Sequence, residues 1–459
     1  MGRLRLAFFS PFNPQRSGVS DYSEELLPYL SNLAEVDLVA GPYVLSNTAI
    51  TRQFCVISAD HFLASRSKYD MAVYQIANSY DHHAYMIPCM RAFPGVAVFH
   101  DYYLHHLVIG LTLGKGDAAS LRRILRTNYG DQATRIFYRL LLSIQDPYQV
   151  SMVRPLIDSA KAIITHNDYA RRLVLKDRPE KHVCVIPMGM PAAASGDRAS
   201  LRAKHGFMPG DFVLTSVSTL SYTKRIEVVL EAFRHLVPRY HSLHLLILGG
   251  GHLGDSARRL IQRSGLEPHI SVTGWLPADA YNDLLVASDA VVDLRYPSGA
   301  ETSASLLRAI AAGKPAIVSA QGSFLELPDD FALKVAVGID ESERLAEAIS
   351  TLADRPALCA KMESSALAYA ESQLRLDRAA AAYIGTIGEA MAIPSTPNTD
   401  LEYRPGRRSP SQLAWSSTYK VFRLCFLCRK YGLTETLNRI RGDRRIRSAQ
   451  PTSQRGAVA

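Results

Sequence analysis

Two adjacent cations, Lys224 and Arg225, stand where a predicted strand has ended and a predicted helix over Ile226–Leu236 begins. Positive charge at a helix N-terminus opposes the helix dipole, so these side chains gain nothing from their own helix. They are better explained by an anion, such as a diphosphate, held between them and the free N–H groups of the helix end. Solvated surface charge is the alternative, and we favour the anion site.

A carboxylate, Glu301, follows another predicted strand, Ala290–Leu294, and precedes a predicted helix over Ala304–Ala312. Thr302 or Ser303 can cap that helix through a side-chain oxygen. Glu301 could simply stabilise the positive end of the helix. Because ligands of open parallel sheets bind beyond the carboxyl ends of the strands, the carboxylate could instead accept hydrogen bonds from ribose or sugar hydroxyls.

Two further candidates follow strands of the first half of the chain. Gly18 lies between the predicted strand Leu4–Ser10 and a helix, where a glycine lets a ligand approach the backbone, although a plain turn would also need one. His100 ends a buried-looking strand and is a candidate ligand contact. A metal site joining it to Asp101 and to His105 or His106 fits no zinc spacing well, so we expect no metal.

The stretch from Gly249 to Gly254 matches the glycine pattern of dinucleotide-binding loops, after a strand and before a helix. That pattern also needs an acid at the end of the next strand, and Val272–Trp275 contains none. A nicotinamide cofactor is therefore not expected. Cys425 and Cys428 have no second cysteine pair beside them, which argues against zinc.

The elements that must position these residues alternate between short β-branched runs and longer helical patterns, as is typical of parallel α/β sheets. In the first half the predicted strands are Leu4–Ser10, Val36–Ala40, Met71–Gln75, Val96–His100, Ala162–His166 and Val183–Pro187. In the second half they are Phe212–Ser218, Leu243–Leu248, Ile270–Thr273, Ala290–Leu294, Ala316–Ser319 and Ala332–Val337. Each set fits a doubly wound open sheet, so we predict an α/β fold with two Rossmann-like domains.

The predicted domains cover residues 1–195 and 196–391, divided at a stretch rich in Ala, Ser and Gly. A long helical insertion over about residues 109–160 interrupts the first domain and is expected to cover the mouth of a site. Residues 392–400 have the composition of a linker, rich in Pro, Ser and Thr.

The basic charge of the chain is concentrated in a tail, residues 401–459, which holds 13 Lys and Arg against three acids. Because the whole chain carries +9, the first 400 residues carry only −1, and nucleic acid is not an expected partner. Within the tail, Tyr419–Tyr431 mixes apolar and basic side chains and would suit an anionic membrane surface. A disordered or partner-docking tail is the alternative.

Length and composition set the broad class. At 459 residues the chain is too long for one typical core, and 47% hydrophobic with 21% charged residues is ordinary for a globular protein. These values exclude a mainly disordered chain, a collagen-like repeat and a coiled-coil rod. Six cysteines are too few for a disulfide scaffold, and no targeting segment or long apolar run is visible, so we expect a cytoplasmic protein.

Together these motifs resemble the GT-B glycosyltransferases, specifically the large retaining group known as GT4, over about residues 4–385. The resemblance is strongest over residues 212–320, where LLILGGG, ISVTGWLP, ASDAVVDL, GAETS and AIAAGKPAIVS follow one another. The loop with Gly18, the His100-Asp101 pair and the VIPMG turn that ends at Gly189 are also similar to features of this family.

Two positions depart from the family pattern. The diphosphate loop of the family often reads R-L-x-x-x-K-G; here Thr219 replaces the Arg and Arg225 the Gly, while Lys224 is retained. The family also has two glutamates separated by seven residues. The second falls on Arg308 in this chain, and Glu301 is one residue nearer to it than the first should be.

The resemblance implies a cleft between the two domains that binds a nucleotide sugar such as UDP- or GDP-hexose. Its diphosphate would contact Gly18, Lys224 and Arg225. Its sugar or nucleotide would contact Gly249, Glu301, Thr302 and Ser303. The implied catalytic residues are His100 and Glu301. Retention is usual in the family, and positive charge with helix N-termini would stabilise the departing nucleoside diphosphate.

We therefore expect a hexosyltransferase that needs no metal or other cofactor. It would act on a glycan or glycolipid acceptor in cell-surface polysaccharide or lipopolysaccharide biosynthesis. It would be cytoplasmic, and peripheral on the inner face of the plasma membrane if the tail binds lipid. Two alternatives stay open, a nucleotide-sugar 2-epimerase of similar shape and a non-catalytic glycosyltransferase-like subunit that organises partners. The helical insertion and tail favour a transferase over the epimerase, while the changed glutamate and loop Arg keep the non-catalytic alternative open.

Overall fold

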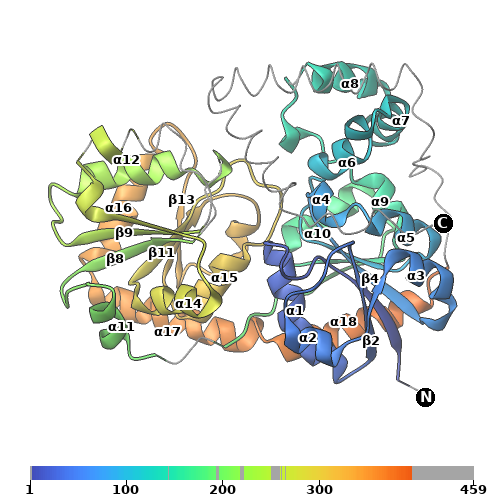
Figure 1. Cartoon of the computed structure of the whole chain (residues 1–459). Coiled ribbons are helices and arrows are strands. Elements are labelled where there is room, and N and C mark those ends of the chain that lie inside the picture. The colour runs from blue at the N-terminus through green and yellow to red at the C-terminus, as the bar shows by residue number, and fades with distance from the viewer. Residues whose placement is uncertain are drawn as a thin grey trace, which may run out of the picture. The chain divides into compact units, whose positions relative to one another are not determined.

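The computed structural model describes residues 3–142, 144–192, 196–217, 222–249, 259, 261–263 and 265–394. The chain divides into two compact units. One joins Met1–Leu104 with Leu156–Pro397, and the other joins His105–Pro155 with Asn398–Ala459. The first unit contains both of the sheets that the structure describes (Figure 1).

The first sheet has seven parallel strands in the order β3-β2-β1-β4-β5-β6-β7. All six residues of the strand Met71–Ile76 are buried, as expected for a strand covered by helices on both faces. The strands are β1 Arg5–Phe9, β2 Glu35–Ala40, β3 Val56–Ser58, β4 Met71–Ile76, β5 Val96–Phe99, β6 Ala162–Thr165 and β7 Val183–Val185.

The second sheet has six parallel strands in the order β10-β9-β8-β11-β12-β13. Its strands are β8 Phe212–Ser216, β9 Leu243–Leu248, β10 Ile270–Gly274, β11 Ala290–Asp293, β12 Ala316–Ser319 and β13 Ala332–Val335. In both sheets the strand order reverses direction once, between β1 and β4 and between β8 and β11. Such switch points are where open α/β sheets bind ligands.

Helices connect the strands and cover the faces of the sheets (Figure 1). Those of the first half are α1 Gly18–Ser31, α2 Thr48–Gln53, α3 Ala59–Ser65, α4 Tyr80–His83, α5 Met86–Ala92, α9 Arg154–Ser159 and α10 Asp168–Asp177. Those that follow are α11 Arg198–Lys204, α12 Ile226–Leu236, α14 Ala278–Ala287, α15 Ala304–Ala311, α16 Glu341–Ala353, α17 Pro356–Gln373 and α18 Leu376–Met391. The second unit contains α6 His105–Leu111, α7 Ala118–Tyr129 and α8 Ala133–Leu141.

Three of the helices that follow strands, α1, α10 and α15, begin with side-chain caps. Ser17 Oγ accepts a hydrogen bond from Val19 N (3.2 Å) at the start of α1, and Asn167 Oδ1 accepts one from Ala170 N (2.7 Å) at α10. Ser303 caps α15, although its 3.4 Å bond from Leu306 N is long. These caps fix where each helix starts and so shape the edge of the sheet at which ligands bind.

The last described helix returns to the first sheet. Helix α18, drawn in orange in Figure 1, contacts α1, β5 and β6. The backbone of Met190 donates a hydrogen bond to Leu374 O (2.7 Å), which fixes the return path. Gly189 is pressed against Leu376, because a Cβ added there would lie 2.9 Å from Leu376 Cα. The predicted domain over residues 196–391 includes α18, which packs on the first half.

The strand predictions are confirmed with small shifts at the ends, and one strand was missed. Val56–Ser58 forms β3, which has only three residues, and two of them are exposed. The expected insertion over about 109–160 overlaps the second unit. The tail over 401–459 and most of the expected linker lie outside the described residues. Among the described helices, none has the length and apolar character needed to cross a membrane.

Candidate functional site

Four charged side chains meet at the switch point of the second sheet. Lys224 ends the 3₁₀ helix η5 (Tyr222–Lys224), which follows β8, and Asp293 is the last residue of β11. Lys224 Nζ lies 3.7 Å from Asp293 Oδ1, and Arg295 Nη2 lies 3.4 Å from Asp293 Oδ2. Arg295 Nη1 donates to Glu301 Oε1 at 2.6 Å. We call Lys224, Asp293, Arg295 and Glu301 the switch-point cluster.

The surroundings of Glu301 keep its carboxylate charged. Gly299 N donates to Glu301 Oε2 at 2.6 Å, in addition to the bond from Arg295. Burial alone would raise the pKa of Glu301, but the charges of Arg295 and Lys224 lower it below its ordinary value. Asp293 has the same balance, with burial opposed by Arg295 and Lys224, and its pKa is also lowered. The cluster therefore presents two stable anions to its two cations.

Lys224 holds its charge less firmly. Its side chain is 13% exposed. Burial, helped by the charge of Arg295, lowers the pKa of its ammonium group to about 8, although Asp293 and Glu301 act in the opposite direction. The ammonium group pairs with Asp293 at 3.7 Å, which is longer than an ordinary hydrogen bond. An anion beside Lys224 would therefore raise its pKa and restore its charge.

Thr302 and Ser303 are engaged in hydrogen bonds within the protein. Ser303 Oγ donates to Asp293 Oδ2 (2.5 Å) and accepts from Arg295 Nη2 (2.6 Å). Thr302 Oγ1 accepts from Asn167 Nδ2 at 2.8 Å. Ser303 thus orients two members of the switch-point cluster, and Thr302 joins the loop before α15 to the start of α10 in the first half.

Arg225 does not join Lys224 in the switch-point cluster. Its backbone has a positive φ of 53°, and its guanidinium forms an ion pair with Glu341 on α16, a carboxylate only 2% exposed. The guanidinium also lies 5.8 Å from the centre of the Tyr296 ring. Of the two cations predicted to contact a diphosphate, the structure brings only Lys224 into the cluster.

His100 is buried among aromatic rings and stays neutral. Its Nε2 lies 2.6 Å from Gln75 Oε1, and its ring packs against Tyr22 and His166 at centroid distances of 5.9 and 4.9 Å. Burial, helped by the positive charge that His166 would carry, lowers the pKa of His100 well below its usual range. The side chain is thus suited to hydrogen bonding rather than to carrying charge.

The neighbouring Asp101 connects the first half to the switch-point cluster. Asp101 Oδ2 accepts a hydrogen bond from Asn78 N (2.8 Å), and the next residue, Tyr102, donates its backbone N–H to Gly299 O (3.0 Å). Burial and the negative charge of Glu301 raise the pKa of Asp101 to about 6. The loop after β5 and the loop after β11 therefore contribute acids to the same region.

The two glycines named from the sequence differ in their constraints. A Cβ added at Gly18 would lie 3.9 Å from Ala304 Cβ, an ordinary contact, so the fold itself does not require glycine there. The same 3.9 Å distance shows that the first turns of α1 and α15 approach each other. Gly249, after β9, has φ of 139°, which favours glycine, and its N–H donates to Gly274 O (3.2 Å). The rest of the loop from Gly250 to Gly254 lies outside the described residues.

Sequence reasoning missed Asp293 and Arg295, and it left Arg308 without a role. Asp293 ends β11 directly at the switch point, which is a signal that could have identified it. Arg308, at the position of the family's second glutamate, lies on α15 and forms an ion pair of 2.6 Å with Glu25 of α1. Away from the cluster, His182, Cys184 and Glu389 are the described residues grouped closely enough to bind a metal ion.

Comparisons with known proteins show what the chain is similar to. Residues 197–368, which include Lys224, Asp293 and Glu301, match the model of the family described as glycosyl transferases group 1. The chain is 26% identical over 181 residues to a putative glycosyltransferase, EpsD, of Bacillus subtilis, covering 39% of this chain and 46% of that protein. It is 24% identical over 174 residues to alpha-monoglucosyldiacylglycerol synthase of Streptococcus pneumoniae, covering 36% of this chain and 39% of the synthase. The matches thus span less than half of these relatives.

Solved structures share the fold over most of the chain. Anabaena HepE in complex with UDP superposes with a TM-score of 0.60 at 18% identity, covering 84% of this chain and all of HepE. WaaG, a glycosyltransferase involved in lipopolysaccharide biosynthesis, gives a TM-score of 0.56 at 15% identity, covering 83% and 99% of the two chains. Residues 197–368 therefore match the group 1 glycosyltransferases, and the two parallel Rossmann-like sheets give the chain the GT-B fold of these solved structures.

Proposed function

We propose that this chain is a hexosyltransferase that transfers a sugar from a nucleoside-diphosphate sugar, UDP- or GDP-hexose, to a glycan or glycolipid acceptor. The observation that carries the proposal is the switch-point cluster, which places a largely buried lysine and a largely buried, charged glutamate in one region of the family-matched segment, residues 197–368. In that arrangement Lys224 would bind the donor diphosphate, and Glu301 would accept hydrogen bonds from the donor sugar.

The proposed mechanism is electrostatic. As the bond from sugar to phosphate lengthens, negative charge grows on the diphosphate and positive charge grows on the sugar ring. Lys224 and the first turns of α1 and α15 would stabilise the negative charge on the diphosphate. The charged Glu301 would stabilise the positive charge on the sugar ring. Arg295 keeps Glu301 ionised and in place through its 2.6 Å hydrogen bond. Retention of configuration, and transfer without a metal ion at the donor site, are part of the proposal.

His100 and Gly18 belong to the first-half side of the proposed site. His100 would act as a neutral hydrogen-bonding group towards the donor or acceptor, after exchanging its bond to Gln75. Gly18 would allow close approach of the ligand at the start of α1, since no neighbour of the fold requires glycine there. Arg225 could contact the diphosphate only in competition with its partner Glu341.

The relatives support the substrate classes. HepE has been crystallised with UDP and with UDP-glucose, which supports a uridine nucleotide as donor. The pneumococcal relative is named for a glycolipid product, and WaaG for lipopolysaccharide biosynthesis, which supports an acceptor at the cell surface. A cytoplasmic protein peripheral to the membrane would meet both donor and acceptor, and the basic tail remains our candidate for that attachment.

The test combines donor binding with one pair of variants. UDP and GDP are titrated against the thermal unfolding of the purified chain, with and without EDTA. A nucleotide at about 100 times its Kd should add roughly 2.7 kcal/mol to the free energy of unfolding. Glu301→Gln should keep nucleotide binding and lose transfer by about 100-fold or more. Glu231→Gln is the control and should keep full activity, because this partly exposed carboxylate on α12 pairs with Arg234 outside the switch-point cluster.

Three outcomes are distinguishable. Binding of one nucleotide in EDTA, with transfer lost in Glu301→Gln alone, supports the proposal. Full activity in Glu301→Gln would overturn the assignment of that carboxylate. Nucleotide binding without transfer or donor hydrolysis in the parent chain, across a panel of glycan and glycolipid acceptors, would favour the non-catalytic subunit.

A further inference from the structure

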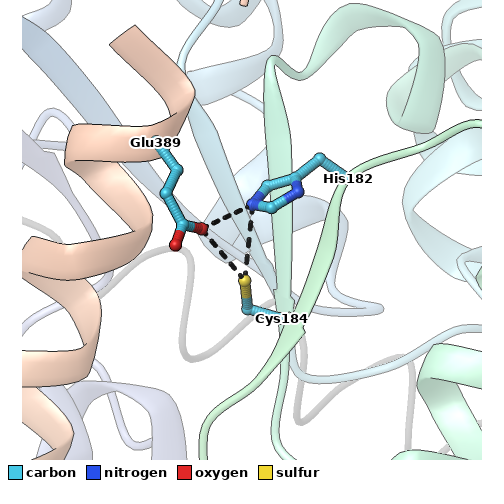
Figure 2. A group of neighbouring side chains, drawn as sticks. All are labelled: His182, Cys184 and Glu389. Carbon is cyan, nitrogen blue, oxygen red and sulfur yellow. Dashed lines mark hydrogen bonds and ion pairs between the residues drawn. The ribbon is translucent and has the colours of Figure 1, made fainter. Parts of the chain in front are cut away.

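Three side chains of the kinds that bind zinc meet at the edge of the first sheet (Figure 2). Cys184 lies in the edge strand β7, and His182 is the residue just before that strand. Glu389 lies on α18. His182 Nε2 lies 2.8 Å from Glu389 Oε2 and 3.5 Å from Cys184 Sγ. Cys184 Sγ lies 3.9 Å from the same carboxylate oxygen. Three different ligand atoms thus converge on one point.

The arrangement does not match a catalytic triad. A cysteine nucleophile needs one histidine nitrogen facing the thiol and a carboxylate orienting the other nitrogen. Here the thiol and the carboxylate both approach Nε2, as Figure 2 shows, so the acid cannot orient the ring while Nε2 accepts a thiol proton. The contacts converge on a common centre instead of forming a relay.

We propose that His182, Cys184 and Glu389 bind a Zn²⁺ ion. With Zn–S of about 2.3 Å and Zn–N and Zn–O of about 2.0–2.2 Å, tetrahedral ligand atoms lie roughly 3.3–3.6 Å from one another. The three observed separations, 2.8, 3.5 and 3.9 Å, scatter around that range. The carboxylate can adjust by the required fraction of an ångström, because the Glu389 side chain is 60% exposed. A thiolate, an imidazole and a carboxylate together select zinc over magnesium or calcium.

Zinc binding would change the chemistry of the cluster in a defined way. The Cys184 thiol loses its proton to solvent and becomes the thiolate ligand, while neutral His182 gives its Nε2 lone pair and Glu389 one carboxylate oxygen. A water molecule completes the fourth position, since the described residues offer three ligands. The ion would tie the edge strand β7 to α18. This departs from our expectation of no metal site, which rested on sequence spacing, and it concerns the first half rather than the donor site.

The binding test uses the full chain in a Cys425→Ser, Cys428→Ser background, so that these thiols do not compete for metal. Titration with Zn²⁺ should show one site per chain, with proton release. Co²⁺ should produce a thiolate-to-metal absorption band in the near ultraviolet. Cys184→Ser should abolish the band and, like Glu389→Gln, weaken Zn²⁺ binding by more than the roughly 10–100-fold cost of losing an outer-shell partner. Cys55→Ser, which changes an exposed cysteine outside the cluster, should leave both signals unchanged.

A second measurement needs no variant at the site. In the folded protein, Zn²⁺ should slow alkylation of Cys184 by iodoacetamide, while alkylation of the exposed Cys55 continues at its original rate. Peptide mass spectrometry separates the two cysteines. Absence of a Co²⁺–thiolate band, Zn²⁺ binding that persists undiminished in Cys184→Ser, or equal alkylation of Cys184 with and without Zn²⁺ would overturn the proposal.

Discussion

At the scale of single residues, Lys224 links donor binding to pH. Burial lowers its pKa to about 8, so in the free site the Lys224 ammonium group loses its charge as the pH rises through that value. We expect the affinity for UDP to fall about tenfold between about pH 7 and 9, following the protonated fraction of one group. Lys224→Arg stays charged across this range and should remove most of the dependence. Calorimetric titration of UDP at a series of pH values measures the effect.

The titration of Lys224 does not destabilise the fold at high pH, so unfolding caused by this group does not explain a fall in UDP affinity. Since its pKa is lower in the folded state than in the unfolded state, the unfolded chain binds more protons between about pH 8 and 10. The contribution of this group to the free energy of unfolding therefore increases over the same interval. A parallel decline of UDP affinity in the parent chain and Lys224→Arg would contradict the assignment.

Replacing Asp101 by a neutral side chain should raise the stability of the protein in a pH-dependent way. Its pKa of about 6 lies above its unfolded value, because burial and Glu301 disfavour its charge. The stabilising contribution of its proton is complete below about pH 4 and is lost as the pH rises through about 6. Asp101→Asn should therefore raise the free energy of unfolding by about 2 kcal/mol at pH 7.5, and by much less at pH 4. Urea unfolding at the two pH values tests this, and an equal change at both would refute it.

Sequence reasoning located part of the candidate site. Lys224 and Glu301 could be identified because they follow strands of the second half and match a family pattern. Arg295 could not, because its importance lies in contacts with Asp293 and Glu301 that only the folded loop creates. Arg225 was grouped with Lys224 because the two are adjacent. The positive φ of Arg225 and its ion pair with the buried Glu341 keep its guanidinium out of the switch-point cluster, and neither feature is visible in the sequence.

At the scale of elements, two glycines provide a matched pair of substitutions. Gly189→Ala would place a Cβ 2.9 Å from Leu376 Cα and 3.1 Å from Leu376 N, so backbone must move at the entry to α18. We expect a loss of about 1–3 kcal/mol in the free energy of unfolding. Gly385→Ala lies within α18 with nothing inside 4 Å and should instead add about 0.5–1 kcal/mol. Denaturant unfolding of both variants measures the contrast, and a harmless Gly189→Ala would mean that the contact is loose.

The elements themselves were largely predictable because buried parallel strands are short, continuous apolar runs. Met71–Ile76 and Leu243–Leu248 come close to this pattern, each interrupted by one polar residue (Gln75 and His244), and both form strands. The strand Val56–Ser58 is not predicted from the sequence, because its three residues at the sheet edge are mostly exposed and form no apolar run. The sheet on which α18 packs could not be predicted either. Helical periodicity shows that a helix has an apolar face, but not which sheet covers that face.

At the scale of the whole molecule, the ion pair between Arg308 and Glu25 joins the two halves of the first unit. Arg308→Glu restores the acid of the family pattern but places it against Glu25. We expect repulsion in this part-buried site to lower the free energy of unfolding by about 1 kcal/mol or more and to lower kcat/KM. Adding Glu25→Arg reverses the pair and should recover stability. Activity that rises in Arg308→Glu alone would instead indicate that the acid contacts the donor.

The return of α18 to the first sheet has a consequence for synthesis on the ribosome. Roughly 190 residues separate the end of β7 from the start of α18, so the first half emerges long before the helix that covers β5 and β6. At about 5–20 residues per second, that interval lasts roughly 10–40 s. During this time the apolar face opposite α18 is open to solvent and to chaperones. The two halves therefore mature together, and nascent chains halted before residue 376 should be degraded faster than the finished protein.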